Sequence, residues 1–245
     1  MQRYFVDQVD DSAPIRISGE DAKHITKVMR MQVGDELIVV HSNVADICKI
    51  TLFDELDVIV EKTGEQIPSP ELPIHVTIAC GLPKGDKLDL IVQKSTELGV
   101  FQITPFEAAR SIVKWDHKKG EKKQQRLQKI AKEAAEQSHR TVIPTVESPI
   151  KFKQLLASAK SYDAIFIADE EDAKLEERTT LKEKIKGLTG LSNVLVVFGP
   201  EGGIDRKESS ALLEVGAKTI SLGPRILRTE TAPLYFLAAI SYEFE

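Results

Sequence analysis

From residue 74 onward, short apolar segments alternate with longer segments that have a helical pattern. We expect strands at residues 74–80, 100–106, 141–147, 163–168, 193–198 and 217–223, and helices at 86–99, 122–140, 152–160, 174–186, 204–216 and 232–244. Short apolar strands that are connected through helices form a parallel sheet covered on both faces. The alternation therefore predicts an α/β fold in which a ligand binds beyond the carboxyl ends of the strands.

The first 72 residues have a different pattern, in which short strands dominate. We expect strands at residues 34–41, 46–53 and 57–64 and a helix at 17–30, which together predict a small β-barrel or sheet. Residues 65–73, EQIPSPELP, contain three prolines, and such a segment neither continues a helix nor lies in a central strand. The sequence thus predicts two domains, residues 1–72 and 73–245.

Charge is distributed unevenly between these two parts. The formal net charge is −5, yet residues 1–72 alone carry 7 Lys or Arg against 14 Asp or Glu. Bulk charge therefore does not indicate nucleic-acid binding, which would need a local basic patch. The two cysteines lie far apart and the histidines lack ligand spacing, so no metal is expected. With no secretory signal or membrane-length apolar run recognised, we expect a cytoplasmic protein.

The segment GPEGGID, residues 199–205, directly follows the strand expected at 193–198. Gly202 and Gly203 lack a Cβ, so backbone amides can approach a flat ligand closely. Asp205 and Glu208 can form a capping box for the next helix. The two common phosphate-binding motifs, GxGxxG and GxxxxGK[ST], are absent. GPEGG alone leaves open a plain strand-to-helix turn of the kind any α/β protein can have.

A second distinctive segment is LGPRILRTETAPL, residues 222–234. Arg225 and Arg228 flank the apolar pair Ile226 and Leu227, and hydroxyl and carboxylate groups follow before an apolar helix begins. This combination suits a pocket that buries an apolar ring system and meets a polyanion at its rim. The alternative is that the two arginines are solvated loop charges.

Four segments resemble signature sequences of the RsmE family, which belongs to the SPOUT methyltransferase superfamily: GPEGGID, LGPRILRTETAPL, KSTELGVFQITPF with the nearby Arg110 and Ser111, and KEAAEQSHR. The N-terminal YFVD, HITKVMRMQVGDELIVV and the proline-bearing linker resemble that family's PUA-like RNA-binding domain. The resemblance implies a SPOUT-type parallel sheet with a C-terminal trefoil knot and a homodimer formed through the knotted domain. It also implies S-adenosyl-L-methionine-dependent methylation of N3 of a uridine in 16S ribosomal RNA, without metal or membrane.

The resemblance further implies a role for individual residues. Arg228 and Glu230 would act near the reacting centre, and Arg110 would help to hold the uridine or its phosphate. The RNA would be free 16S rRNA or the assembled small ribosomal subunit, contacted by Lys23, Lys27, Arg30, Arg110, His139 and Arg140. The cofactor pocket would comprise Ala168, Asp169, Phe198, Gly199, Pro200, Glu201, Gly202, Gly203, Leu222, Gly223, Ile226, Leu227, Arg228, Thr231 and Ala232.

Three alternatives remain open from the residues alone. The same cofactor could serve methylation of another RNA base or of a ribose 2′-hydroxyl. The chain could instead be a non-catalytic RNA-binding module. The basic segment at 114–129, with seven Lys or Arg against two acids, suits either a phosphate contact or a solvated helix face.

Overall fold

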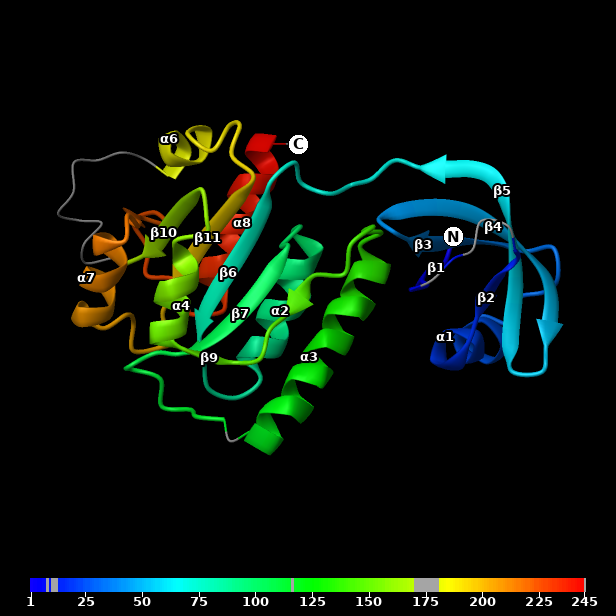
Figure 1. Cartoon of the computed structure of the whole chain (residues 1–245), viewed down its shortest axis with the longest axis horizontal. Helices are drawn as coiled ribbons and strands as arrows, with labels where there is room; N and C mark the ends of the chain where they lie inside the picture. Colours follow the sequence, from blue (N-terminus) through cyan, green and yellow to red (C-terminus); the bar gives the residue numbers. More distant parts are fainter. Residues whose placement is uncertain (8, 10–12, 116, 170–180, 245) are drawn as a thin grey trace. The chain divides into compact units, whose positions relative to one another are not determined.

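A computed structural model of the chain describes residues 1–7, 9, 13–115, 117–169 and 181–244 (Figure 1). The chain divides into two compact units. The first comprises residues 1–71 together with 135–142, and the second comprises residues 72–134 and 143–245. Nothing in the sequence indicated that residues 135–142, at the end of a long helix, group with the first unit.

The first unit contains a five-stranded sheet whose strand order is β1-β3-β4-β5-β2. Its strands are β1 (Arg3–Phe5), β2 (Ile15–Ile17), β3 (Glu36–His41), β4 (Val44–Asp54) and β5 (Asp57–Ile67). The pair β1–β3 is parallel, and the other pairs are antiparallel. Alternate apolar side chains of these strands, such as Leu37, Cys48 and Val60, pack into one core with Tyr4 and Ile25.

One expected helix of this unit is shorter than predicted. The α-helix α1 covers only Gly19–Lys23, and a π-helical turn follows at His24–Val28 (η1). The Thr26 hydroxyl donates to the carbonyl of Ala22 at 2.8 Å, a bond that competes with regular helix geometry. The prediction of one continuous helix over 17–30 is therefore wrong, and the spacing of side chains along it differs from that of an α-helix.

The second unit contains a parallel sheet with the order β12-β10-β11-β6-β7-β8, in which β9 also pairs with β7. All its described pairs are parallel, which confirms the predicted α/β architecture. The strands are β6 (His75–Gly81), β7 (Gln102–Glu107), β8 (Thr145–Val146), β9 (Ile150–Lys151), β10 (Ala164–Ala168), β11 (Asn193–Phe198) and β12 (Lys218–Ile220).

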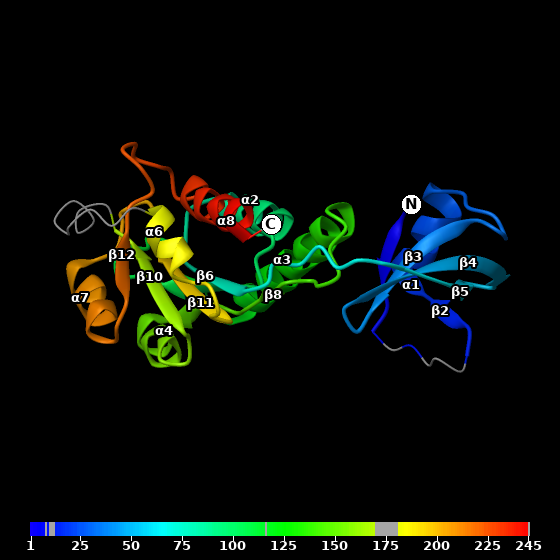
Figure 2. The ribbon, with the colours of Figure 1, turned by 90° about the horizontal axis from the view of Figure 1, so that it is seen from above.

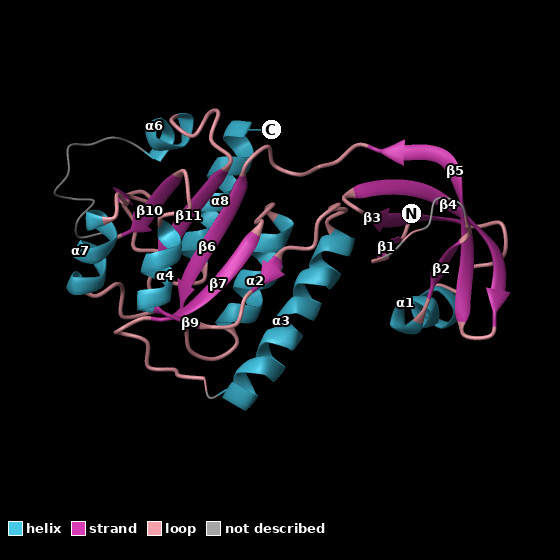
Figure 3. Ribbon diagram, viewed as in Figure 1, coloured by secondary structure: helices cyan, strands magenta, loops and turns pink. Residues whose placement is uncertain are grey.

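Helices cover both faces of this sheet (Figures 2 and 3). Side chains of β6 and β11 alternate between two apolar clusters, so that Val196 faces one cluster and Val197 the other. The first cluster includes residues of α2 (Lys87–Glu97), α3 (His117–Gln137), α6 (Leu181–Lys186) and α8 (Thr231–Phe244). The second includes residues of α4 (Phe152–Ala159) and α7 (Arg206–Glu214).

Two expectations for this unit concern its helices. The helix expected at 174–186 is seen as α6 from Leu181, and its earlier part lies outside the described residues. Helix α8 buries Phe236, Leu237 and Ile240, whereas Tyr242 is 89% exposed, so its apolar surface is not covered all round. Among the described residues, no helix combines the length and apolar character needed to cross a bilayer.

Candidate functional site: a pocket at the carboxyl ends of the strands

Three neighbouring strands end side by side at one edge of the parallel sheet. Ala168 at the end of β10 is in register with Phe198 of β11 and with Ile220 of β12. The segments that follow these strands are therefore brought together. They are the turns in which the sequence analysis had found GPEGGID and LGPRILRTETAPL.

These turns enclose a cavity of about 310 Å³. Apolar side chains such as Leu222 and Leu227 share its wall with polar groups, among them Asp169 and Arg110. A volume of this size lies at the lower end of small-molecule sites, which usually combine an apolar wall with a few polar groups. The expected cofactor residues that line it are Ala168, Asp169, Phe198, Gly199, Pro200, Glu201, Gly202, Gly203, Leu222, Ile226, Leu227 and Ala232.

The agreement between expected and observed lining is incomplete. Gly223, Arg228 and Thr231 do not line the cavity, and Ile226 does so with a side chain that is 84% exposed. Thr229, one of the hydroxyl-bearing residues expected before the apolar helix, does line it, and so do Ile204 and Ile220, which had not been singled out. A signal existed for Ile204, which lies within GPEGGID, whereas Ile220 ends β12 three residues earlier than the strand expected at 217–223.

The GPEGGID turn is too tight for a side chain at its first glycine. A Cβ on Gly199 would lie 2.7 Å from the carbonyl carbon of Gly203 and 2.8 Å from the Ile204 nitrogen. Gly203 has φ of +72°, and its N–H donates to the Pro200 carbonyl at 2.8 Å. The part of the cavity wall that this turn supplies therefore carries few side-chain atoms at its glycines.

The helix after this turn begins with the predicted capping box. The Asp205 carboxylate accepts from the Lys207 N–H at 3.0 Å, and Glu208 accepts from the Asp205 N–H at 3.4 Å. The other Glu208 oxygen accepts from the Ala109 N–H at 2.9 Å, so this buried carboxylate also anchors the segment before Arg110. The capping-box prediction is confirmed.

Arg110 lies against the same turn. Its Nη1 donates to the Gly202 carbonyl at 3.1 Å, and its Nε lies 3.6 Å from the Asp205 carboxylate. The guanidinium is still half-exposed and lines the cavity. Arg110 can therefore contact a bound molecule while the turn holds it in place.

A cluster of three charged side chains joins the turns around the cavity. Lys87, the first residue of α2, places its Nζ 2.9 Å from Glu201 Oε1 and 3.4 Å from Glu230 Oε2. Burial alone would raise the pKa of Glu201, but the hydrogen bonds from Lys87 and from the backbone N–H groups of Glu201 and Lys84, together with the Lys87 charge, outweigh it and hold that pKa below the usual value. The hydrogen bond to Glu201 raises the pKa of Lys87.

Sequence reasoning had not singled out Lys87. It begins α2, the helix that follows β6, and the carboxyl end of β6 adjoins that of β11, since Cys80 is in register with Phe198. That neighbourhood depends on the order of strands in the sheet. A lysine in the first turn of a helix carries no signal of it in the sequence.

Arg228 is exposed, and its carbonyl accepts from the N–H groups of Thr231 and Ala232 at 2.9 and 3.1 Å. These bonds belong to the first turn of α8, so the backbone of Arg228 starts that helix while its guanidinium faces solvent. Glu230 is partly buried, and its Oε2 makes no hydrogen bond in the described part of the chain. The two residues expected near the reacting centre therefore differ in environment.

The expected RNA contacts also differ from one another. Lys23, Lys27 and Arg30 are exposed, although the π-helical turn and the φ of +53° at Arg30 replace the continuous helix face that had been expected. Of these, Lys23 lies 4.0 Å from Glu20. Exposure leaves all three accessible to an anionic partner.

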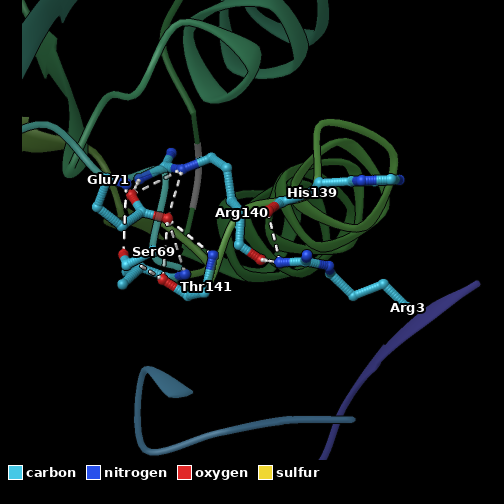
Figure 4. Close-up of polar contacts among 7 residues, drawn as sticks. Arg3, Ser69, Glu71, His139, Arg140 and Thr141 are labelled. Carbon is cyan, nitrogen blue, oxygen red and sulfur yellow. Dashed lines mark hydrogen bonds and ion pairs between the residues drawn. The ribbon is translucent and has the colours of Figure 1, made fainter. Parts of the chain in front are cut away.

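Arg140, by contrast, is enclosed by its own unit (Figure 4). Its side chain is 5% exposed, and its Nε donates to Glu71 Oε2 at 3.0 Å. Glu71 Oε1 also accepts from the N–H groups of Thr141 and Val142 at 2.8 and 3.1 Å. This environment favours a structural role for the Arg140 side chain.

Arg3 completes this cluster by donating to the carbonyl oxygens of His139 and Arg140 (Figure 4). His139 has φ of +60°, and its imidazole points away from the cluster. Burial lowers the pKa of Arg3. The KEAAEQSHR segment thus ends in a turn whose carbonyl groups are capped by an arginine from β1.

The basic segment at 114–129 has several of its described cations engaged within the chain. Lys123 Nζ lies 4.7 Å from the ring centroid of Trp115, Arg126 pairs with Asp89, and Lys129 lies 3.9 Å from Glu133. Trp115 is partly buried and packs against the core. In the described part of the chain, no group of three or more potential metal ligands is found.

Comparison with known proteins gives two family matches. The family model for an RNA methyltransferase domain matches residues 70–241, and the model for an RNA methyltransferase PUA domain matches residues 17–59. The chain is also 46% identical to "Ribosomal RNA small subunit methyltransferase E" of Bacillus subtilis (strain 168), with 100% of this chain and 98% of that protein covered.

Two crystal structures of similar chains contain a ligand. The Neisseria gonorrhoeae ribosomal RNA small subunit methyltransferase E, bound to S-adenosyl methionine, is 28% identical with a TM-score of 0.84 and covers 100% of this chain and 98% of its own. A methyltransferase from Legionella pneumophila, in complex with the cofactor SAM, is 27% identical with a TM-score of 0.80 and covers 98% and 97%.

Proposed function

Because the chain belongs to the RsmE family of RNA methyltransferases, we propose that it transfers a methyl group from S-adenosyl-L-methionine to N3 of a uridine in 16S ribosomal RNA. The observation that carries the proposal is the pocket at the carboxyl ends of β10, β11 and β12. The domain assignment remains part of the proposal, with residues 1–72 binding RNA and 73–245 catalysing the transfer. An rRNA substrate implies action in the cytoplasm.

The pocket residues fit this cofactor. Leu222, Ile226 and Leu227 offer an apolar surface for adenine, and the backbone of the GPEGGID turn offers polar groups to its edge. Asp169 and Glu201 line the same cavity, and carboxylates suit the sulfonium and ammonium charges of the cofactor. Since this cofactor has no phosphate, the pocket needs no phosphate-binding motif.

When bound, S-adenosyl-L-methionine supplies an electrophilic methyl group attached to a sulfonium. Uracil N3 carries a proton and becomes a nucleophile only when that proton is lost. A carbon–nitrogen bond then forms as the carbon–sulfur bond breaks, and the products are the N3-methylated uridine, S-adenosylhomocysteine and a proton. The chain must therefore accept a proton or stabilise the uracil anion, and it must position both reactants.

We assign these tasks to groups around the pocket. Arg228, with an exposed guanidinium, neutralises the uracil anion, and Glu230 holds its carboxylate near the reacting centre. Arg110, fixed by Gly202 and Asp205, holds the uridine or its phosphate. N3 lies on the pairing edge of the base, so the target uridine must be unpaired or flipped out of its helix.

We also propose the contacts outside the pocket. Lys23, Lys27 and Arg30 bind RNA phosphates and His139 provides a further contact, whereas the burial of Arg140 favours a supporting role for that residue. The assembly is a homodimer formed through a knotted C-terminal region. Exposed apolar side chains on α2 and α8, namely Leu90, Tyr235 and Tyr242, support the dimer, and sedimentation velocity at micromolar concentration tests it.

The experiment for the activity has two parts. Calorimetric titration with S-adenosyl-L-methionine should give saturable binding, and its absence at millimolar ligand would favour a non-catalytic RNA-binding module. Small subunits and free 16S rRNA from a strain that lacks the gene should then gain one methyl group on uridine N3, located by mass mapping. A methyl group on another base or on a ribose 2′-hydroxyl would overturn the proposed target.

In the same assay, Arg228→Ala should abolish methyl transfer while the circular dichroism spectrum stays that of the wild type. Its exposed side chain supports no buried contact, so the fold should tolerate the change. Unchanged turnover would remove Arg228 from the mechanism.

A further inference from the structure

We propose that Lys87 is a positioning residue that couples the two loops around the pocket and aims Glu230 at the reacting centre. The inference deepens the proposed methyl transfer and rests on it. Its basis is geometric, because one ammonium group contacts carboxylates from both loops. Glu201 belongs to the GPEGGID turn, and Glu230 belongs to the loop that precedes α8.

Glu201 is held by two hydrogen-bond donors. Glu201 Oε1 accepts from Lys87 Nζ at 2.9 Å and from the backbone N–H of Lys84 at 3.1 Å. The segment between β6 and α2 therefore holds the GPEGGID turn through one carboxylate oxygen. Because Glu201 itself lines the pocket, this contact acts on the wall that the cofactor meets.

On the Glu230 side, Lys87 has no described substitute. Glu230 Oε2 is buried and makes no hydrogen bond within the described part of the chain, and Lys87 Nζ at 3.4 Å is its described ion-pair partner. Thr229, the preceding residue, lines the pocket. The orientation of the Glu230 carboxylate therefore depends on Lys87, and it is set one residue away from the cavity wall.

The shared ammonium also keeps two like charges together. Glu201 and Glu230 both approach the same Nζ, and without the cation their carboxylates would repel one another. The repulsion would move the less firmly held carboxylate. Glu201 keeps its bond from the Lys84 backbone, so Glu230 is the one expected to move.

The contacts of Lys87 with Glu230 and with Glu201 predict different effects on the rate of methyl transfer and on cofactor affinity. Loss of Lys87 should lower the rate of methyl transfer strongly, since displacement of a group at the reacting centre by about 1 Å can cost about 100-fold. It should weaken cofactor binding only several-fold, because the Lys84 bond still anchors Glu201. Thermal stability should change by about 2 °C or less, as partly exposed ion pairs stabilise a fold little.

The test compares Lys87→Met with Lys87→Arg and with Lys84→Met in the full-length protein. Lys84 is the matched control, since it is exposed three residues earlier and its described bond to Glu201 uses the backbone, which the variant keeps. We expect kcat to fall about 10- to 100-fold in Lys87→Met, to recover mostly in Lys87→Arg, and to stay near the wild-type value in Lys84→Met.

A double-mutant cycle then identifies the residue through which Lys87 acts. In a Glu230→Gln background, Lys87→Met should cause little further loss of kcat, because both changes remove the same interaction. Additive losses, or a Lys87→Met enzyme with wild-type kcat, would overturn the inference. A wild-type protein that neither binds S-adenosyl-L-methionine nor methylates RNA would overturn the proposed function as well, so the two failures are distinguishable.

Discussion

Two clusters of charged residues in this chain have similar chemistry but different environments. In the first unit, Arg140 pairs with Glu71, whose Oε1 also accepts two backbone N–H groups, and the arginine is almost fully buried. In the second unit, Lys87 pairs with Glu201 and Glu230 beside a cavity, and Glu230 Oε2 makes no described hydrogen bond. The first cluster has its acceptors occupied by its own unit, while the second lies beside a cavity that Glu201 lines, so that Glu201 can also meet a ligand.

This contrast distinguishes structural ion pairs from functional ones. A buried charge that loses its partner is destabilising by several kcal/mol, so removing either member of the Glu71–Arg140 pair should cost the fold heavily. A partly exposed pair contributes at most about 1 kcal/mol to stability. Charges that contribute so little to the fold, yet lie at a cavity, are better explained by what they do to a ligand.

The largest expected effect tests the buried cluster. Glu71→Gln should lower the free energy of unfolding of the first unit by about 3–5 kcal/mol, because the buried Arg140 loses its counter-charge. Urea denaturation followed by circular dichroism measures the change. Glu61→Gln, on the exposed part of β5, is the control and should stay within about 0.5 kcal/mol. Equal losses in the two variants would refute the structural role.

The buried carboxylate of Asp46 predicts how the stability of the first unit changes at acid pH. Burial would raise the pKa of Asp46, but hydrogen bonds from His41, Gln66 and Lys62 outweigh it, so the pKa lies below the usual value. The stabilisation is therefore present above the unfolded pKa of about 4 and is lost as pH falls through the folded pKa. Asp46→Asn should cost about 1.5–3 kcal/mol at pH 7 and less at pH 3, measured by denaturation at both pH values.

The next effect concerns the pocket wall. Gly199→Ala should lower stability by about 1–3 kcal/mol and weaken S-adenosyl-L-methionine binding at least about 10-fold, because the new methyl would collide with the backbone of Gly203 and Ile204. Gly202→Ala is the milder comparison, since its Cβ would lie 3.2 Å from the Arg110 Cβ, a tight contact but not a collision of the kind met at Gly199. Calorimetry that finds both variants equally affected would contradict the tight-turn explanation.

Much of the second unit could be predicted from its sequence. Strands such as Asn193–Phe198 are apolar after their first residue and bounded by turn residues, and the capping pair Asp205 and Glu208 is a local signal. The motif segments also indicated most residues that line the cavity, since each follows a strand end. Strand runs and helix caps could be predicted because residues close together in the sequence determine them.

The features that could not be predicted depend on contacts between residues far apart in the sequence. Lys87 meets Glu201 because β6 lies next to β11, and Arg140 is buried because Glu71 lies beside it, 69 positions away in the sequence. Such pairings follow from strand order and chain path, which no window of residues reveals. The π-helical turn at His24–Val28 was missed because apolar spacing alone does not distinguish it from an α-helix.

The smallest expected effect on stability comes from Glu201→Gln at the pocket. Glu201→Gln makes the same chemical change as Glu71→Gln, and it also removes one carboxylate charge from an ion pair. Its effect on the free energy of unfolding should be below about 1 kcal/mol, because Glu201 and Lys87 are both partly exposed. The glutamine can still accept the Lys84 N–H through its amide oxygen, so the turn should keep its shape.

Cofactor binding should respond where stability does not. Replacing the carboxylate with an amide removes a negative charge from the pocket wall, and we expect the dissociation constant for S-adenosyl-L-methionine to rise about 5- to 10-fold in low salt, measured by calorimetry. Glu71→Gln should leave that constant near the wild-type value at temperatures where the protein is folded. If Glu201→Gln instead destabilised the fold as much as Glu71→Gln and left cofactor affinity unchanged, the distinction between an occupied and an available charge cluster would be wrong.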